Sequence, residues 1–268
     1  MEYDPIKKQL GDVFNKSPFL RKLFYKLLDL LLLRCWHIHR EIKLWKKNNP
    51  SPKRILDAGM GFGQYTYYMS QLFTNTPIDA VDVKEDQVSD CTAFFKRSGI
   101  QDVHFSVADL TAFTSNQSYD LALSVDVMEH ILEDVLVFKN ILAVLRPGGM
   151  LLISTPSDQG GSDVRGEGEE SFIGEHVRDG YGVEEIQQKL KTAGFSKTEV
   201  LYSYGWPGKI SWRLSMKYPI SLLSASRLFF VILPFYYLLV YPLCFLLNAL
   251  DTRMKHPTGT GLIVKAWK

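Results

Sequence analysis

The chain has 268 residues, of which 46% are apolar and 22% charged, so it can bury the core of one large domain and is not a disordered protein. Its three cysteines, Cys35, Cys91 and Cys244, match neither a disulfide framework nor a metal-binding motif, which argues against thiol chemistry and favours a reducing compartment. Because the first five residues lack the pattern of a secretory signal, we expect the domain to stay in the cytoplasm.

The net charge of +2 hides a strong asymmetry. Residues 1–54 carry a net charge of +8 and residues 205–268 one of +7, whereas residues 55–204 carry −13. Two basic ends around an acidic middle indicate a shared face and an anionic partner. Because both ends are also rich in Leu and Phe, an anionic membrane surface fits better than nucleic acid, and we expect no nucleic-acid partner.

Residues 19–47 predict one long, basic amphipathic helix. Its apolar positions recur at steps of three and four residues: Leu20, Phe24, Leu27, Leu31, Cys35, Ile38, Ile42 and Trp45. Two interpretations stay open, a helix that packs on its own domain and a helix that lies in the membrane interface.

From Arg54 onwards, short apolar runs alternate with helical stretches. This alternation predicts an α/β fold with a doubly wound, mostly parallel seven-stranded sheet covered by helices on both faces. The expected strands are 54–57, 78–82, 103–107, 120–125, 150–155, 197–204 and 260–267, and the expected helices are 64–73, 85–98, 133–145 and 183–193. In such a sheet ligands bind beyond the carboxyl ends of the strands, so functional residues should follow the strands directly.

The first predicted strand runs into a glycine-rich turn. Gly59 and Gly61 permit positive φ and a close approach of the backbone to a ligand, and Gly63 lets the next helix pack near the strand. Asp57 precedes the first glycine by two residues, where an acid suits the cationic amino group of an amino-acid moiety and repels a pyrophosphate. A tight turn without a ligand is the plain structural alternative.

Acids also end the next two predicted strands. Asp82 can accept hydrogen bonds from both ribose hydroxyls, and Asp109, followed by the apolar Leu110, suits an adenine amino group and its adjoining slot. Each acid alone could be a surface or capping residue. Three in succession indicate a ligand with amino, ribose and adenine groups.

With these motifs the chain resembles class I S-adenosylmethionine-dependent methyltransferases, in the small-molecule branch that includes quinone-biosynthesis methyltransferases. The resemblance runs from about Arg54 to Phe195 and resumes over the last strand. It implies S-adenosylmethionine as the cofactor, with Asp57, Gly59 and Gly61 at its methionine part, Asp82 at its ribose, and Asp109 and Leu110 at its adenine. Asp126, in the loop after the fourth strand, is a further cofactor-binding candidate, although many members carry a small or neutral residue there.

Methyl transfer from a sulfonium requires alignment of the acceptor and, for some acceptors, removal of a proton. His130 and His176 are the candidate bases, because histidine titrates near neutrality. The plain alternatives are a structural loop residue for His130 and an anchor of the loop for His176. We expect no metal, although Glu129, His130 and His176 could meet as a divalent site. The segment 157–182 carries seven glycines and predicts a lid over the acceptor site, or else a solvated linker.

The stretch 228–247 contains no charged residue and is long enough to cross a bilayer. Because the strands on either side of it should be neighbours in one sheet, it must leave and return on the same side. It therefore either dips into the membrane and turns at Pro234 and Pro242, or pairs with 209–226 as a helical hairpin. A buried hairpin that roofs the active site or forms a dimer interface is the alternative to membrane attachment.

The expected organisation is a basic helical region at 1–50, a methyltransferase domain at 51–205 and 258–268, and an apolar insertion at 206–257. The predicted function is methyl transfer, preferably to oxygen, on a lipophilic small molecule or lipid at the cytoplasmic face of a membrane. A cofactor-binding scaffold of a membrane complex and a nicotinamide-dependent dehydrogenase are the alternatives.

Overall fold

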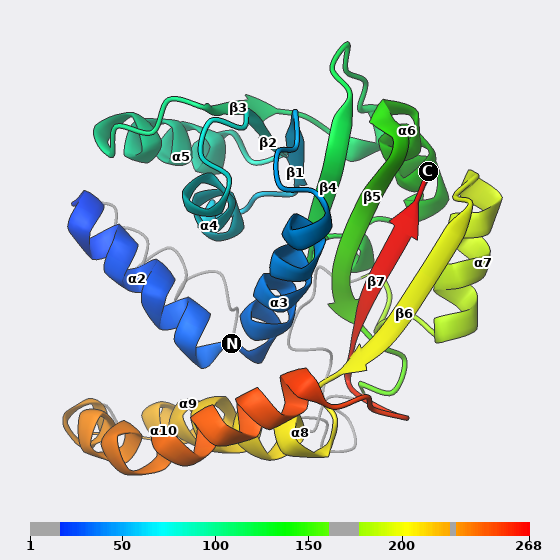
Figure 1. Cartoon of the computed structure of the whole chain (residues 1–268). Coiled ribbons are helices and arrows are strands. Elements are labelled where there is room, and N and C mark those ends of the chain that lie inside the picture. The colour runs from blue at the N-terminus through cyan, green and yellow to red at the C-terminus, as the bar shows by residue number, and fades with distance from the viewer. Residues whose placement is uncertain (1–16, 161–176, 226–228) are drawn as a thin grey trace.

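The computed structural model describes residues 17–160, 177–225 and 229–268, and within them a seven-stranded sheet of order β3-β2-β1-β4-β5-β7-β6 (Figure 1). Its strands are β1 (Ile55–Ala58), β2 (Ile78–Asp82), β3 (Val103–Val107), β4 (Tyr119–Val125), β5 (Leu145–Pro156), β6 (Lys197–Ser203) and β7 (Gly261–Trp267). The first five strands are parallel to one another, and β7 is antiparallel to both β5 and β6. The predicted fold class is confirmed, and the strand order reverses between β1 and β4, where such sheets bind ligands.

Helices cover both faces of the sheet because the strands carry apolar side chains on both sides. One face is packed by α6 (Asp134–Val144) and α7 (Val183–Ala193). The other is packed by α3 (Leu33–Asn48), α4 (Gln64–Leu72) and α5 (Glu85–Arg97). The core therefore lies in two layers, one on each face of the sheet.

The predicted single helix over 19–47 is wrong in one respect. The chain forms two helices, α2 (Pro18–Leu31) and α3, because Leu32 between them adopts an extended backbone conformation. Only α3 buries the expected apolar face, with Cys35, Ile38 and Ile42 fully inaccessible. In α2 the buried residues are instead Arg21 and Tyr25, and part of its apolar face is exposed.

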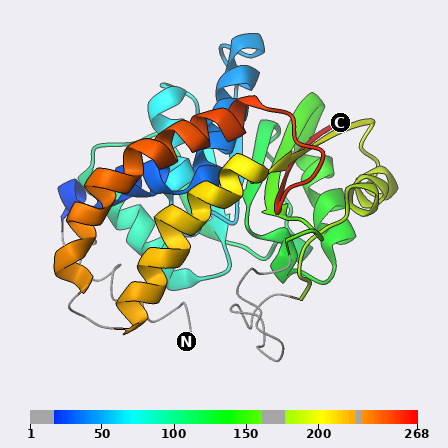
Figure 2. The same cartoon turned by 90° about the horizontal axis from the view of Figure 1, so that it is seen from below.

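The apolar insertion between β6 and β7 forms a helical hairpin, the second of the two predicted solutions. Its first arm comprises α8 (Trp206–Trp212), a π-helical turn (Arg213–Lys217) and α9 (Tyr218–Ala225), and its second arm is α10 (Phe229–Arg253). Tyr236 and Tyr237 of α10 donate hydrogen bonds to the carbonyls of Leu214 and Ser215, which pins the arms side by side (Figure 2). This hairpin forms a helical layer beyond the carboxyl ends of the parallel strands (Figure 1).

Candidate active site

The glycine turn after β1 has the backbone that a close ligand requires. Gly59, Gly61 and Gly63 all adopt positive φ, at 87°, 52° and 73°. A Cβ at Gly59 would lie 2.3 Å from a methyl group of Val127, so this glycine is needed for packing. A Cβ at Gly61 would meet no atom within 4 Å, so the turn presents open space there to a bound molecule.

Asp57 is a buried carboxyl directly beneath this turn. It is 2% exposed and accepts a hydrogen bond of 2.5 Å from the Thr66 hydroxyl. Burial raises its pKa to about 7, the Thr66 hydrogen bond opposes this, and the negative charge of Asp82 raises it further. A cationic group bound above the turn would stabilise the carboxylate, which fits the ammonium of a methionine moiety.

Asp82 and Asp109 stand at the ends of β2 and β3, as predicted, but both already hold backbone groups. Asp82 accepts hydrogen bonds from the amides of Gly61 and Lys84, at 2.9 and 3.0 Å. Asp109 is exposed and caps a short 3-10 helix, and the Thr111 amide and hydroxyl lower its pKa. Leu110 lies buried in the core beside it. The acids thus keep the ends of their loops in place, and their ligand contacts stay predictions.

Asp126 lies after β4 at a φ of 53°, in an ion pair with Arg34 of α3. The Arg34 amide donates a hydrogen bond of 3.1 Å to the hydroxyl of Tyr204, which follows β6 and also has a positive φ, 56°. Burial raises the pKa of Tyr204 to about 12, so it stays a neutral phenol. Three segments far apart in the sequence therefore meet beyond β4, and the sequence signalled only Asp126.

Glu129 and His130 occupy the short helix that follows Asp126. Glu129 is buried and accepts a 3.0 Å hydrogen bond from Thr155 of β5, and burial raises its pKa against the opposing charges of His130 and Arg34. His130 is half-buried, and its predicted role as a base stays a prediction. His176 lies outside the described residues, so its predicted role as a base stays a prediction. Among the residues that the structure describes, no group of three metal-ligating side chains is found.

The C-terminal end of the predicted lid segment is held by buried polar contacts. Tyr181 is fully buried, and its hydroxyl donates to Asp134, which also pairs with Arg178 and Lys189. Burial by itself would raise the pKa of Asp134, but the hydrogen bonds from Lys189 and Tyr181 and the charge of Arg178 hold it below its usual value. Residues 161–176 of the predicted lid lie outside the described residues.

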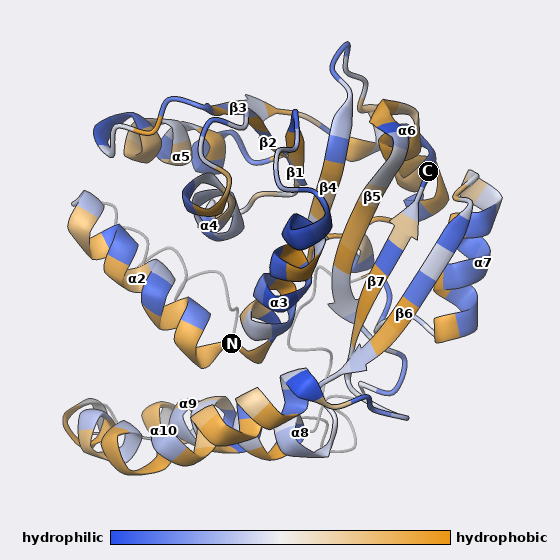
Figure 3. Ribbon diagram, viewed as in Figure 1, coloured by the Kyte–Doolittle hydropathy of each residue, from blue (hydrophilic) through white to orange (hydrophobic). Residues whose placement is uncertain are grey.

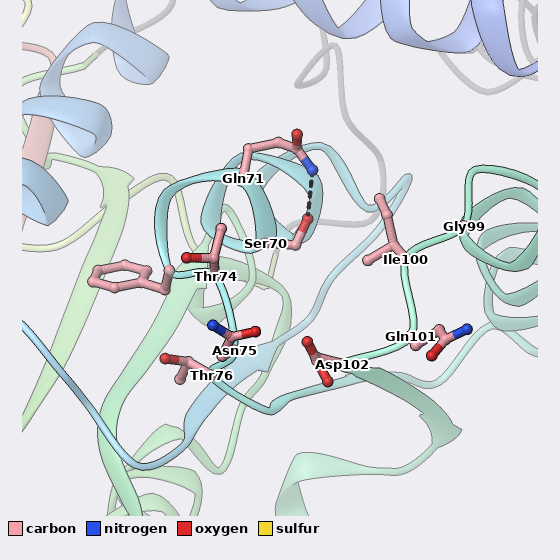
Figure 4. A pocket seen from close by; sticks show the side chains of 10 residues that line it. Ser70, Gln71, Thr74, Asn75, Thr76, Gly99, Ile100, Gln101 and Asp102 are labelled. Carbon is pink, nitrogen blue, oxygen red and sulfur yellow. Dashed lines mark hydrogen bonds between the residues drawn. The ribbon is translucent and has the colours of Figure 1, made fainter.

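A surface depression of about 300 Å³ is found away from these residues (Figure 4). It is lined by side chains that include Ser70, Thr76 and Asp102; Thr76 lies two residues before β2, and Asp102 directly precedes β3. It therefore lies at the amino ends of the strands, on the opposite edge of the sheet from Asp82 and Asp109, and takes no part in the site.

Residues 50–198 match the model of a methyltransferase domain, which covers more than half of the chain. The chain belongs to this methyltransferase family. The match begins after α3 and ends just inside β6, so α2, α3 and the whole hairpin lie outside it.

The similar curated proteins are methyltransferases of different acceptors. Phosphoethanolamine N-methyltransferase 1 of Zea mays is 31% identical over 153 residues, which are 56% of this chain and 30% of that protein. Ubiquinone biosynthesis O-methyltransferase of Rickettsia canadensis is 32% identical over 110 residues, 40% of this chain and 44% of that protein. The chain thus spans less than half the length of either relative.

A solved structure with a similar fold is phosphoethanolamine N-methyltransferase 2 of Haemonchus contortus in complex with S-adenosyl-L-methionine. It superposes with a TM-score of 0.60 at 20% identity, covering 86% of this chain and 52% of that one. The predicted class I methyltransferase fold and S-adenosylmethionine as cofactor are confirmed, and family membership indicates methyl transfer rather than hydride transfer.

The residues of the turn fit this cofactor. The open space over Gly61 suits a ligand, and the buried Asp57 suits its ammonium. S-adenosylmethionine, when bound, supplies the electrophilic methyl group. Prediction from the sequence missed Thr66, Arg34 and Tyr204, whose partners lie 9 to 170 residues away in the chain and leave no local signal.

Proposed function

We propose that this protein transfers a methyl group from S-adenosylmethionine to a lipophilic acceptor at the cytoplasmic face of a membrane, with oxygen as the preferred acceptor atom. The observation that carries the proposal is the apolar outer surface of α10, next to the end of the sheet that holds the cofactor residues. An enzyme has reason to sit at a bilayer when its acceptor dissolves there.

The helix α10 exposes large apolar side chains along its length. Within it, Val231–Arg253 is long and apolar enough to cross a membrane, yet only 11% of its most apolar stretch is buried in the protein. Leu238 and Leu239 are 74% and 80% exposed. Burial of such side chains in lipid contributes roughly 1.5–3 kcal/mol each. A helix that served as the core of the fold would be mostly buried, which speaks against the roofing alternative.

The charge of the hairpin complements an anionic lipid surface. Residues 206–257 contain six Lys and Arg and a single acid, Asp251. That acid is fully buried, and Arg253 and Lys255 beside it are exposed. Because β6 and β7 pair along their whole length, both ends of the hairpin return to one sheet edge, which favours attachment to one leaflet over a crossing.

Within the site, His130 is the candidate base for an acidic acceptor hydroxyl, and Glu129 beside it would stabilise the imidazolium. The ion pair of Arg34 with Asp126 fixes the loop from which both residues project. A non-catalytic scaffold would make the same contacts with the cofactor but would not require His130 as a base.

The test uses the full chain, labelled S-adenosylmethionine and vesicles made from bacterial or plant lipid extracts with a quinol precursor added. We expect the protein to float with anionic vesicles and to label a lipid-soluble product. The double variant Leu238→Gln/Leu239→Gln should lower vesicle affinity about tenfold or more, while Leu136→Gln, an exposed leucine of α6, should not. Cofactor binding with no labelled product from any lipid would support the scaffold instead, and failure to float would remove the membrane from the proposal.

A further inference from the structure

In the helix α2 polar side chains are buried and several apolar side chains are exposed, which is the reverse of an ordinary surface helix. Its buried side chains are Arg21 and Tyr25, whereas Phe19, Leu23, Leu27 and Leu30 are exposed. These four residues are spaced at intervals of four, four and three, so they form one stripe along the outer side of the helix. An exposed apolar stripe of this length is unusual for a surface that faces only water.

The inner side of α2 holds the glycine turn of the cofactor site. Arg21 Nη2 donates a hydrogen bond of 2.9 Å to the carbonyl of Phe62, and the Tyr25 hydroxyl donates to the same carbonyl. Arg21 Nε also donates to the Tyr25 hydroxyl at 2.8 Å, and its guanidinium lies 4.8 Å from the ring centroid of Phe94. Phe62 lies between Gly61 and Gly63, so α2 contacts the turn where two glycines give the backbone the most conformational freedom.

The outer stripe of α2 continues onto α10. The carbonyl of Leu30, its last member, accepts hydrogen bonds from Trp36 Nε1 at 3.1 Å and from the Tyr241 hydroxyl at 2.8 Å. The rings of Trp36 and Phe245 pack edge to face at 4.9 Å. The stripe therefore joins the apolar face of the hairpin through aromatic residues of the kind that membrane interfaces favour. Figure 3 shows many hydrophobic residues, in orange, along both α2 and α10.

The charged residues of α2 indicate what kind of partner would contact the outer stripe. Lys22 and Lys26 border the stripe along one side, and Lys26 is exposed. The single acid of the helix, Asp29, is turned inward and accepts a hydrogen bond of 2.6 Å from Gln64. An apolar stripe bordered by lysines alone matches an anionic bilayer better than a protein partner with mixed charges.

We propose that the outer stripe of α2 is a second membrane-contacting surface, and that an anionic bilayer bound there tightens S-adenosylmethionine binding by holding Arg21 and Tyr25 on the glycine turn. This inference rests on the proposed membrane function and adds a coupling between lipid and cofactor. In the docked position of α2 the stripe lies beside the apolar face of α10, so one bilayer can contact both surfaces at once and thereby favours that position. By linkage, the cofactor must then tighten membrane binding by the same factor.

The experiment measures the dissociation constant of S-adenosylmethionine for the full chain by equilibrium dialysis, without vesicles, with phosphatidylcholine vesicles and with vesicles containing phosphatidylglycerol. We expect anionic vesicles to tighten cofactor binding about fivefold or more. The variant Leu23→Gln/Leu27→Gln should lose that response and bind vesicles more weakly. Leu44→Gln, an exposed leucine of α3 away from the stripe, should retain both.

The variant Tyr25→Phe separates docking from coupling, because it removes one of the two hydrogen bonds that α2 donates to the Phe62 carbonyl and leaves the outer stripe intact. It should bind vesicles as the parent does, while its cofactor affinity responds to them less than that of the parent. An unchanged cofactor affinity of the parent on bound vesicles would overturn the inference and leave membrane attachment through the hairpin standing. Absence of vesicle binding by the parent would overturn both.

Discussion

The domain built on the sheet buries its apolar side chains, whereas α2 and the hairpin α8–α10 expose many of theirs and bury charged ones. In the sheet domain, apolar side chains fill two core layers, and Asp82 and Asp109 lie near strand ends, where they accept hydrogen bonds from loop amides. In α2 and the hairpin, apolar side chains face outward, while Arg21 and Asp251 are buried. The contrast indicates that the outer helices are attached to the domain by polar contacts and keep their apolar surface for a different medium.

The largest expected effect concerns catalysis in the sheet domain. His130→Ala should lower kcat about 10²–10⁴-fold, the range of a lost general base, with cofactor affinity changed less than about twofold. Turnover measured under saturating cofactor, with cofactor binding measured separately, checks this. His176→Ala is the matched variant, and a loss confined to it would assign the base to His176 and leave His130 a structural residue of the loop.

The second effect tests how the hairpin is attached. Asp251 of α10 accepts hydrogen bonds from the amides of Tyr204 and Gly208 and contacts His37 of α3 at 2.8 Å and His256 at 3.3 Å. Asp251→Ala leaves these buried partners unsatisfied and should cost about 3 kcal/mol or more of stability. Hydrogen exchange in detergent should then show faster exchange in 206–253 and little change in β5.

The matched control for Asp251 is Glu199→Gln, which removes a half-exposed carboxylate from Lys265 at the sheet edge. Because solvent screens that pair, the change in stability should stay within about 0.5 kcal/mol. Equal destabilisation of hairpin and sheet by Asp251→Ala would mean that the hairpin is an integral part of the domain, and the contrast between the two regions would lose its basis.

The two regions also differ in how much their sequence revealed. The strands β2 and β3 were predicted to the residue, because an apolar run that ends in an acid is a local signal. The break at Leu32 and the reversed burial of α2 were not predicted, since Arg21 finds its partner at Phe62, 41 residues along the chain. Likewise, Arg34 and Asp126 are 92 residues apart. Local patterns reveal strand ends, whereas long-range polar contacts that bury a charge leave no periodicity.

The smallest effect sharpens the claim that the glycine turn binds a cation. The folded protein raises the pKa of Asp57 from 3.8 to about 7, so without cofactor its contribution to stability is lost as the pH rises through that interval. The affinity for the cofactor changes with pH in the opposite direction, because the ammonium of the cofactor binds the ionised carboxylate better than the neutral acid. Affinity for S-adenosylmethionine should therefore rise roughly five- to tenfold from pH 6 to pH 7.5, below the range of about 7.7–8.0 in which an α-amino group loses its own proton.

Titration calorimetry of the parent, Asp57→Asn and Asp109→Asn separates the turn from the other acids. Asp57→Asn should bind the cofactor weakly and without this pH dependence. Asp109 has a lowered pKa and is ionised throughout the interval, so Asp109→Asn should weaken binding equally at both pH values and keep the slope. If Asp57→Asn retained the slope, the titrating group would lie elsewhere, and the burial of Asp57 would serve the packing of the turn through Thr66 rather than recognition of the ammonium.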